Sequence, residues 1–116
     1  MRFKLLLALV DDDRRDAVLK AAREAGATGA TTITSARGEG LNPKKTFFGL
    51  DLESQRDIVL LVVEEHLARG ILEAMAEAGK FDAEPGSGIA FQIAIEDAVG
   101  LASQIKALAK RVEDKL

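Results

Sequence analysis

A pattern of strand, helix and strand occurs twice in this 116-residue sequence, and it constrains the fold more than any single motif. Phe3 to Val10 is a nearly continuous apolar run, typical of a strand covered on both faces. A helical pattern follows up to about Ala25, and Thr31 to Ser35 is rich in β-branched residues, which favours a second strand. The first half therefore predicts strand, helix and strand in that order.

The first predicted helix carries recognisable boundary signals. We expect Asp12 or Asp13 to cap its start, because an aspartate side chain can accept from the free N–H groups of the first turn. We expect Gly26 to end it in a left-handed conformation, which glycine adopts without steric cost. The residues predicted to face the core are Ala17, Val18, Ala21, Ala22 and Ala25.

The second half of the chain repeats the order. Residues 58–63 form an apolar strand pattern, residues 65–78 a helical one that Gly79 should stop, and residues 89–96 a last strand. One stripe of that helix contains Leu67, Ile71, Met75 and Ala78. The repeated order predicts an α+β fold: a ferredoxin-like βαββαβ sandwich with both helices on one face of a four-stranded sheet, spanning about residues 2–97.

Two segments lie outside this predicted core. The stretch of about residues 37–56 has weak periodicity, and a loop of that length in a small domain is usually functional, disordered or held by a partner. Residues 98–115 predict a C-terminal helix that packs on the domain or on a neighbouring subunit. Its apolar seam consists of Leu101, Ile105, Leu108 and Val112.

Composition excludes several classes of protein. A hydrophobic content of 47% excludes a disordered chain, and 116 residues suffice for a single domain, residues 1–116. Apolar runs such as 58–63 are far too short to cross a bilayer, and Met1 to Val10 is followed at once by aspartates, so we interpret it as a strand. The chain has no cysteine, which fits a cytoplasmic protein, and a net charge of −3 argues against nonspecific nucleic-acid binding.

Two glycine segments stand between helical and strand patterns, at residues 26–31 and 85–91. In the second, Gly86 and Gly88 flank Ser87, so that backbone N–H groups are covered by little side chain. Such a run can form a concave nest for an anion, phosphate above all. The alternative is an ordinary loop that closes a helix and opens a strand.

Other polar residues give weaker signals. Residues 11–13 are three aspartates that could ligate a hard cation, although such a triplet more often serves a helix start. His66 lacks a second histidine or a cysteine for a zinc site, and a capping or solvated role is favoured. Because His66 is the only histidine, Ser87 has no obvious base for a Ser-His-Asp hydrolase. We therefore expect no catalytic residue, no metal ligand and no enzymatic activity.

Taken together, these segments resemble the PII signal-transduction (nitrogen regulatory) proteins, as a divergent PII-like member. The matching segments are the helix that ends at Gly26, Thr28-Gly29-Ala30-Thr31, Gly38-Glu39-Gly40, Val62-Val63, Gly86-Ser87-Gly88 before Phe91, and Glu96-Asp97-Ala98-Val99. The resemblance implies a homotrimer with an adenine nucleotide (ATP, ADP or AMP) in the clefts between subunits. It also implies that the long loop, the T-loop, regulates a target protein, for example a membrane transporter.

The resemblance assigns candidate ligand-binding residues. It places Leu9 and Val62 near the base, Gly29 and Thr31 along the cleft, Gly38 and Gly40 at the base of the T-loop, and Gly86, Ser87 and Gly88 at the phosphates. Ile89 stands where the family usually has a lysine, Leu41 where it has an arginine, and Gly100 and Ala102 or Ser103 where it has arginines. Loss of these cations removes charge-assisted bonds to a polyphosphate. An adenosine compound of lower charge, or no ligand, therefore remains open.

The predicted T-loop also departs from the family pattern. The chain has no tyrosine, so the tyrosine uridylylation of some members cannot occur. Lys44 and Lys45 precede Phe47 and Phe48, which could anchor a partner or fold back onto the trimer. The sequence thus predicts a trimeric, non-enzymatic regulator that senses a small ligand. One alternative is a degenerate scaffold of the same fold that binds a partner but no nucleotide. A further alternative is a small ferredoxin-like enzyme or metal-binding protein that uses Asp11 to Asp13 and His66.

Overall fold

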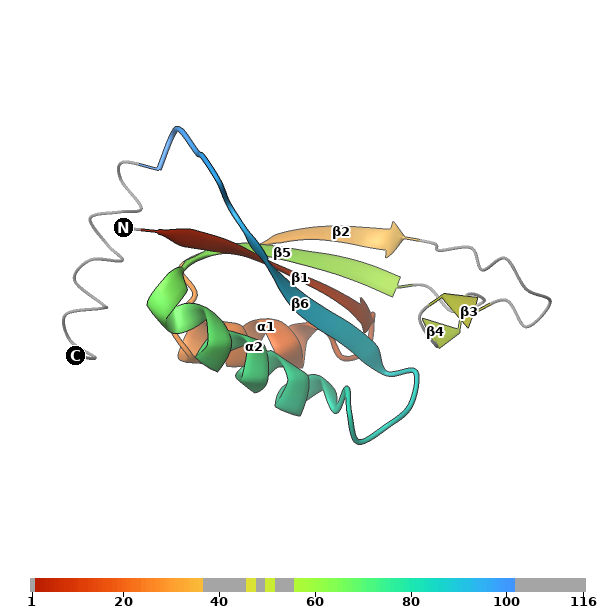
Figure 1. Ribbon diagram of the computed structural model, residues 1–116. Coiled ribbons are helices and arrows are strands. Elements are labelled where there is room, and N and C mark those ends of the chain that lie inside the picture. Colours follow the sequence, from red (N-terminus) through yellow and green to blue (C-terminus); the bar gives the residue numbers. More distant parts are fainter. Residues whose placement is uncertain (1, 37–45, 48–49, 52–55, 102–116) are drawn as a thin grey trace.

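A computed structural model describes residues 2–36, 46–47, 50–51 and 56–101 of the chain (Figure 1). It contains, in order, β1 (Phe3–Asp11), α1 (Arg15–Glu24), β2 (Thr31–Ala36), β3 (Thr46–Phe47), β4 (Leu50–Asp51), β5 (Arg56–Glu64), α2 (Glu65–Gly79) and β6 (Gly88–Ala94). The predicted double pattern of strand, helix and strand is confirmed, with the short β3–β4 hairpin between its halves.

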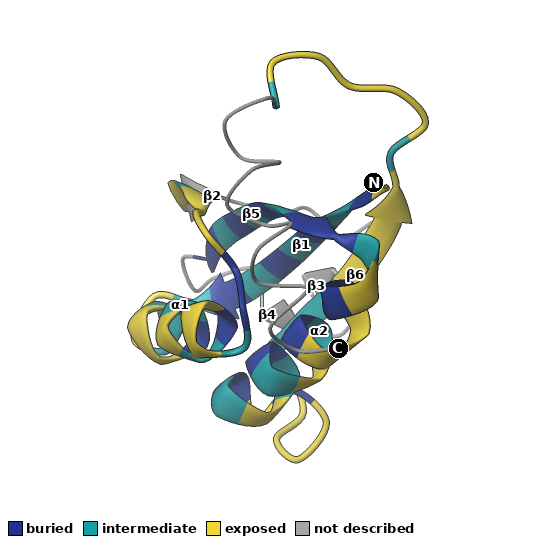
Figure 2. Cartoon of the chain, turned by 90° about the vertical axis from the view of Figure 1, so that its left-hand side faces the viewer, coloured by how far each residue is buried: buried dark blue, intermediate teal, exposed yellow. Residues whose placement is uncertain are grey.

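The main sheet has the strand order β2-β5-β1-β6, and every neighbouring pair is antiparallel. Both helices cover the same face of this sheet (Figures 1 and 2). In the middle of the sheet, Leu7 lies opposite Leu60 on one side and Phe91 on the other. This is the predicted α+β ferredoxin-like sandwich.

The core lies between the helices and the inner face of the sheet. Alternate residues of the two central strands are buried there, because successive side chains of a strand point to opposite faces. The buried cluster consists of Leu6, Ala8, Val10, Val18, Ala22, Ala27, Val59, Leu61, Val63, Leu67, Ala68, Ile71, Met75 and Phe81. Ala17, predicted to face the core, is exposed instead, since the buried stripe of α1 centres on Val18 and Ala22.

The outer face of the sheet is also apolar, although no described helix covers it. The strand register places on it Leu5, Leu7, Leu9, Ile33, Ile58, Leu60, Val62, Ile89, Phe91 and Ile93. Ile33, Phe91 and Ile93 are 47%, 37% and 43% exposed. A contiguous apolar surface of this kind typically marks an interface.

The start of α1 differs from the prediction. Its N-cap is Arg14, with no side-chain cap bond, so the expected capping by Asp12 or Asp13 is wrong. The reason is that β1 extends to Asp11, which pairs with Arg56 of β5, and the Asp11 carbonyl accepts from the Arg14 N–H at 3.0 Å. Asp12 and Asp13 are thereby placed in the turn before the cap. At the other end, Gly26 follows the C-cap with φ 125°, as predicted.

The end of α2 also differs in detail. Gly79 is the last helical residue and not the stop signal; Lys80 takes the left-handed position with φ 55°. The glycine at position 79 has a packing reason, because a Cβ there would lie 2.2 Å from Cε1 of Phe81.

The start of α2 is held by a buried carboxylate. Glu64, 2% exposed, is the N-cap: one of its oxygens accepts from the His66 N–H at 2.7 Å, and the other lies 2.6 Å from His66 Nδ1. The hydrogen bond to Glu64 raises the pKa of His66 above its ordinary value. Glu64 is thus the cap, and the exposed His66 has the solvated one of the two roles that the sequence favoured, with its ring against the Glu64 carboxylate.

This contact predicts a pH-dependent stability. Because the pKa of His66 is raised in the folded state, its stabilising contribution is full below the ordinary histidine pKa of about 6.5 and is lost as the pH rises through the raised value. An NMR titration should give a raised His66 pKa in the wild type and a lower one in Glu64→Gln. Glu73→Gln, on the same helix, should leave it unchanged. A Glu64→Gln titration that matches the wild type would contradict the assignment.

The chain leaves the sheet after β6 as an extended arm (Figure 1). Residues 98–101 are not helical. The remainder of the helix predicted for residues 98–115 lies outside the described residues.

Candidate functional site

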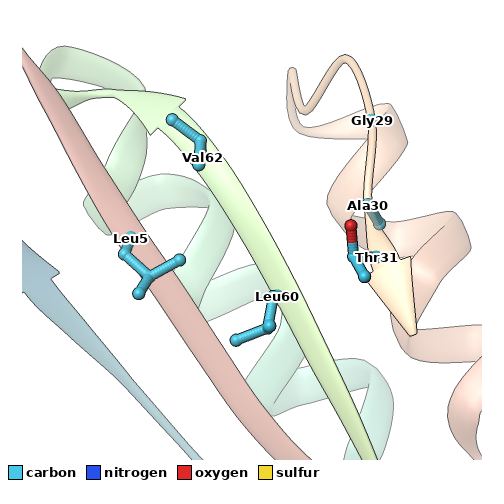
Figure 3. Close-up of a pocket in the computed structure, with 6 residues that line it drawn as sticks. All are labelled: Leu5, Gly29, Ala30, Thr31, Leu60 and Val62. Atoms are coloured by element: carbon cyan, nitrogen blue, oxygen red, sulfur yellow. The ribbon is translucent and has the colours of Figure 1, made fainter. Parts of the chain in front are cut away.

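A pocket of about 350 Å³ opens on the outer face of the sheet, between β5 and the start of β2 (Figure 3). It is lined by Leu5, Gly29, Ala30, Thr31, Leu60 and Val62. The leucine and valine side chains come from β1 and β5, and the other wall is the chain that enters β2. The lining is apolar apart from the Thr31 hydroxyl and the backbone, a composition that suits a flat, largely uncharged group.

Three of the predicted ligand-binding residues meet in this pocket: Gly29, Thr31 and Val62. Leu9 lies farther along the same face, opposite Ile58 and Ile89. The sequence interpretation missed Leu5, Ala30 and Leu60. Strand alternation could have predicted Leu60, which is two residues from Val62 and therefore on the same face. Leu5 follows only from the strand register, in which it lies opposite Val62.

The glycine loop, residues 85–88, lies on the β6 side of the same sheet. Gly88 begins β6 opposite Val10 of β1, whereas the pocket lies between β5 and the start of β2 and reaches β1 only at Leu5, which lies opposite Ile93. Gly86 has φ 79°, a left-handed conformation that favours glycine. Within one chain, Gly86, Ser87 and Gly88 therefore lie at the other end of the β1–β6 ladder from the pocket.

Two polar groups of Ser87 form hydrogen bonds to the turn that precedes the glycine loop. The Ser87 N–H donates to the Glu84 carbonyl at 3.1 Å, and its hydroxyl donates to the Lys80 carbonyl at 2.8 Å. Ser87 is only 4% exposed. Its hydroxyl thus closes the turn after α2, which is a structural role and not that of a nucleophile.

Phe81 explains two of the nearby glycines by packing. Its ring is buried, and a Cβ at Gly79 or Gly88 would lie 2.2 or 2.4 Å from Cε1 of that ring. A Cβ at Gly88 would also lie 2.7 Å from the backbone oxygen of Leu9. Gly88 is therefore required by close approach of the ring and the neighbouring strand, whether or not the loop binds a ligand.

Arg14 connects the start of α1 to the same loop. Its guanidinium donates to the Gly79 carbonyl at 2.7 Å and forms an ion pair with Glu84. The ion pair lowers the pKa of Glu84 and raises that of Arg14. Arg14 thereby satisfies a backbone carbonyl at the C-terminal end of α2. Its ion pair with Glu84 fixes the turn from which the glycine loop starts.

Two further ion pairs lie where β5 follows the long loop. Arg56, which is buried, pairs with Asp11 across the β1–β5 ladder, and Arg15 donates to the buried Asp57 at 2.8 Å. These pairs fix the root of the loop to β1 and α1. The other predicted loop residues, Gly38, Gly40, Lys44, Lys45 and Phe48, lie outside the described residues; Phe47 belongs to β3, and its side chain is not described.

The described residues contain no group of three or more histidine, aspartate or glutamate side chains placed to hold a metal ion. Within the same residues, no helix is long and apolar enough to cross a membrane.

Comparison with protein families identifies the fold and the site segments as parts of one family. The family model "Nitrogen regulatory protein P-II" matches residues 3–104. The chain belongs to the PII family. The match includes the pocket, the glycine loop and the T-loop, and it ends before the last twelve residues. A search of curated proteins found no significant match.

Solved structures share the PII fold with this chain. A PII-like signalling protein from Thermus thermophilus matches with a TM-score of 0.60 and 22% identity, over 82% of this chain and 87% of that one. The apo form of CPII from Thiomonas intermedia, a nitrogen regulatory PII-like protein, matches with a TM-score of 0.62 and 19% identity, over 82% and 90%. CPII bound to ADP, AMP and acetate matches with a TM-score of 0.60 and 19% identity, over 83% and 90%.

Proposed function

We propose that this PII protein is a trimeric, non-enzymatic regulator that binds an adenine nucleotide in clefts between subunits and acts on a target protein through its T-loop. The observation that carries the proposal is the pocket that gathers Gly29, Thr31 and Val62 on the outer face of the sheet. Its apolar walls suit a purine ring, and the neighbour CPII has been solved with ADP and AMP.

The strand order supports a site shared between subunits. The pocket reaches β1 only at Leu5, and Gly88 lies opposite Val10, five positions farther along β1, so we place the two parts of one ligand site on neighbouring subunits. In a closed ring with head-to-tail contacts, the β2 edge of one subunit can face the β6 edge of the next. Such an assembly would also bury the apolar outer face of each sheet.

Filling the pocket should weaken ligand binding. A Cβ at Gly29 meets no atom within 4 Å, so Gly29→Leu can be accommodated, and it adds a leucine side chain to the wall of the pocket. Calorimetry with ATP, ADP, AMP and cyclic AMP should show binding to the wild type and a loss of about tenfold or more in the variant. Gly70→Leu, an equally open site on exposed α2 surface, is the matched control and should bind as the wild type does.

The second candidate function is a degenerate scaffold that binds a partner but no nucleotide. It is favoured by one observation: Phe81 accounts for Gly79 and Gly88 without any ligand. If none of the four nucleotides produces heat at millimolar concentration, the sensor proposal fails and the scaffold stands.

We place contact with the target protein on the T-loop, through Lys44, Lys45, Phe47 and Phe48. Two basic residues beside two aromatic residues form a suitable anchor for a protein surface. A membrane transporter is the target class that the family resemblance suggests, and the regulator would then act from the cytoplasm.

A further inference from the structure

The two turns beside the glycine loop carry an excess of negative charge. The turn after β1 contributes Asp11, Asp12 and Asp13, and the turn after α2 contributes Asp82 and Glu84. The basic groups paired with these carboxylates are Arg14, Lys80 and Arg56. Five carboxylates and three basic groups leave a formal net charge of −2.

The two turns form one surface. Arg14 spans them, because it follows Asp13 in the chain and binds both the Gly79 carbonyl and the Glu84 carboxylate. Asp11 and Asp13 both act electrostatically on Arg14. Figure 1 shows the end of β1 and the loop between α2 and β6 at the same end of the sheet.

The cations of this surface are already engaged by carboxylates of the protein. Arg14 pairs with Glu84, and Arg56 pairs with Asp11 and keeps only 6% of its side chain exposed. Lys80 Nζ lies 3.9 Å from Glu84. In contrast, Asp12 and Asp13 are exposed. The charge presented to solvent beside the glycine loop is therefore negative.

The pocket that would complete the site supplies no compensating cation. Its lining residues are all uncharged. Directly after Gly88, Ile89 lies opposite Leu9 and extends the apolar outer face. Among the described residues, the pocket offers no basic side chain to a phosphate group, and on the glycine-loop side Arg14 and Lys80 both face the Glu84 carboxylate.

We propose that Asp12 and Asp13 make the site select adenosine ligands of low negative charge, a nucleoside or a monophosphate, over polyphosphates. The inference rests on the proposed nucleotide function. ATP carries about two more negative charges than AMP, and repulsion from a net charge of −2 near a water-exposed site lowers its relative affinity by on the order of tenfold at low salt. Asp12 and Asp13 are thus specificity-determining residues that repel the wrong ligand.

The experiment compares adenosine, AMP, ADP and ATP by calorimetry on the full chain, with EDTA present so that no divalent cation masks ligand charge. The test variant is Asp12→Asn with Asp13→Asn, in an exposed turn that supplies no helix cap. The matched control is Glu24→Gln with Glu73→Gln, which changes the net charge equally at helix positions outside the two turns.

The wild type should bind AMP and adenosine about tenfold more tightly than ATP at low salt. The Asn variant should gain several-fold in ATP affinity and nothing for adenosine, whereas the control should gain neither. Added salt should reduce the difference in affinity between AMP and ATP, because salt screens the repulsion between the carboxylates and ATP. At a cationic phosphate site, added salt would instead weaken ATP binding. Wild-type ATP binding as tight as that of AMP, or equal gains for adenosine and ATP in the variant, overturns the inference alone. Absence of binding by all four ligands overturns the proposed function and this inference together.

Discussion

Gly88→Ala should lower the free energy of unfolding by about 3 kcal/mol, a large cost for one added methyl group. The new Cβ would lie 2.7 Å from the backbone oxygen of Leu9 and 2.4 Å from the Phe81 ring. Leu9 belongs to central strand β1, whose backbone is fixed by ladders on both sides, and Phe81 is buried. Neither neighbour can move without disturbing the core, and urea unfolding monitored by circular dichroism measures the loss.

Gly79 and Gly70 provide the matched comparison on one helix. Alanine normally adds about 1 kcal/mol to helix stability relative to glycine. Gly70→Ala should gain about that amount, since a Cβ there meets no atom within 4 Å. Gly79→Ala should instead be destabilising in the wild type and much less so in a Phe81→Ala background, because Phe81 supplies all three nearest atoms. Equal stabilisation at both positions would refute the packing role of Phe81.

The repeated pattern of the sequence predicted the architecture because local signals and burial agree there. The apolar run predicted as a strand is β1, and alternate residues of it are buried. The stripe through Leu67, Ile71 and Met75 is the buried side of α2, which covers that sheet face. Ends of elements were less predictable. Asp12 and Asp13 are favourable caps in isolation, but the β1–β5 ladder extends to Asp11 and shifts the helix start to Arg14.

The candidate site was predictable only where it depends on one segment. Gly29 and Thr31 are two residues apart in one segment, and the family resemblance added Val62 of β5 to the predicted site. The Phe81 ring against Gly88 depends on how α2 returns to the sheet, which no local pattern encodes. The same limit applies to Arg14, whose partner Glu84 is 70 residues away.

Phe91→Asp should abolish the proposed trimer. Phe91 lies on the apolar outer face, on edge strand β6, and is 37% exposed in the chain itself. An aspartate there can stay hydrated in a monomer, so the fold of the single chain should tolerate it. In a trimer that buries the outer faces, the same substitution would place three carboxylates in an apolar interface without partners, which costs several kcal/mol per group. We therefore expect a monomer by analytical ultracentrifugation at concentrations where the wild type is a trimer.

Gln92→Asp is the control for the assembly argument. Gln92 is the next residue of the same strand, is exposed, and points to the opposite face of the sheet. It receives the same charge at nearly the same position, so any general effect of charge on β6 appears in both variants. A trimeric Phe91→Asp protein would show that the outer face is not the interface. Suppose that Phe91→Asp is monomeric and also loses nucleotide binding, while Gln92→Asp still forms the trimer and still binds nucleotide. The ligand site then requires more than one subunit. That result is expected because the pocket and the glycine loop lie at different ends of the β1–β6 ladder in a single chain.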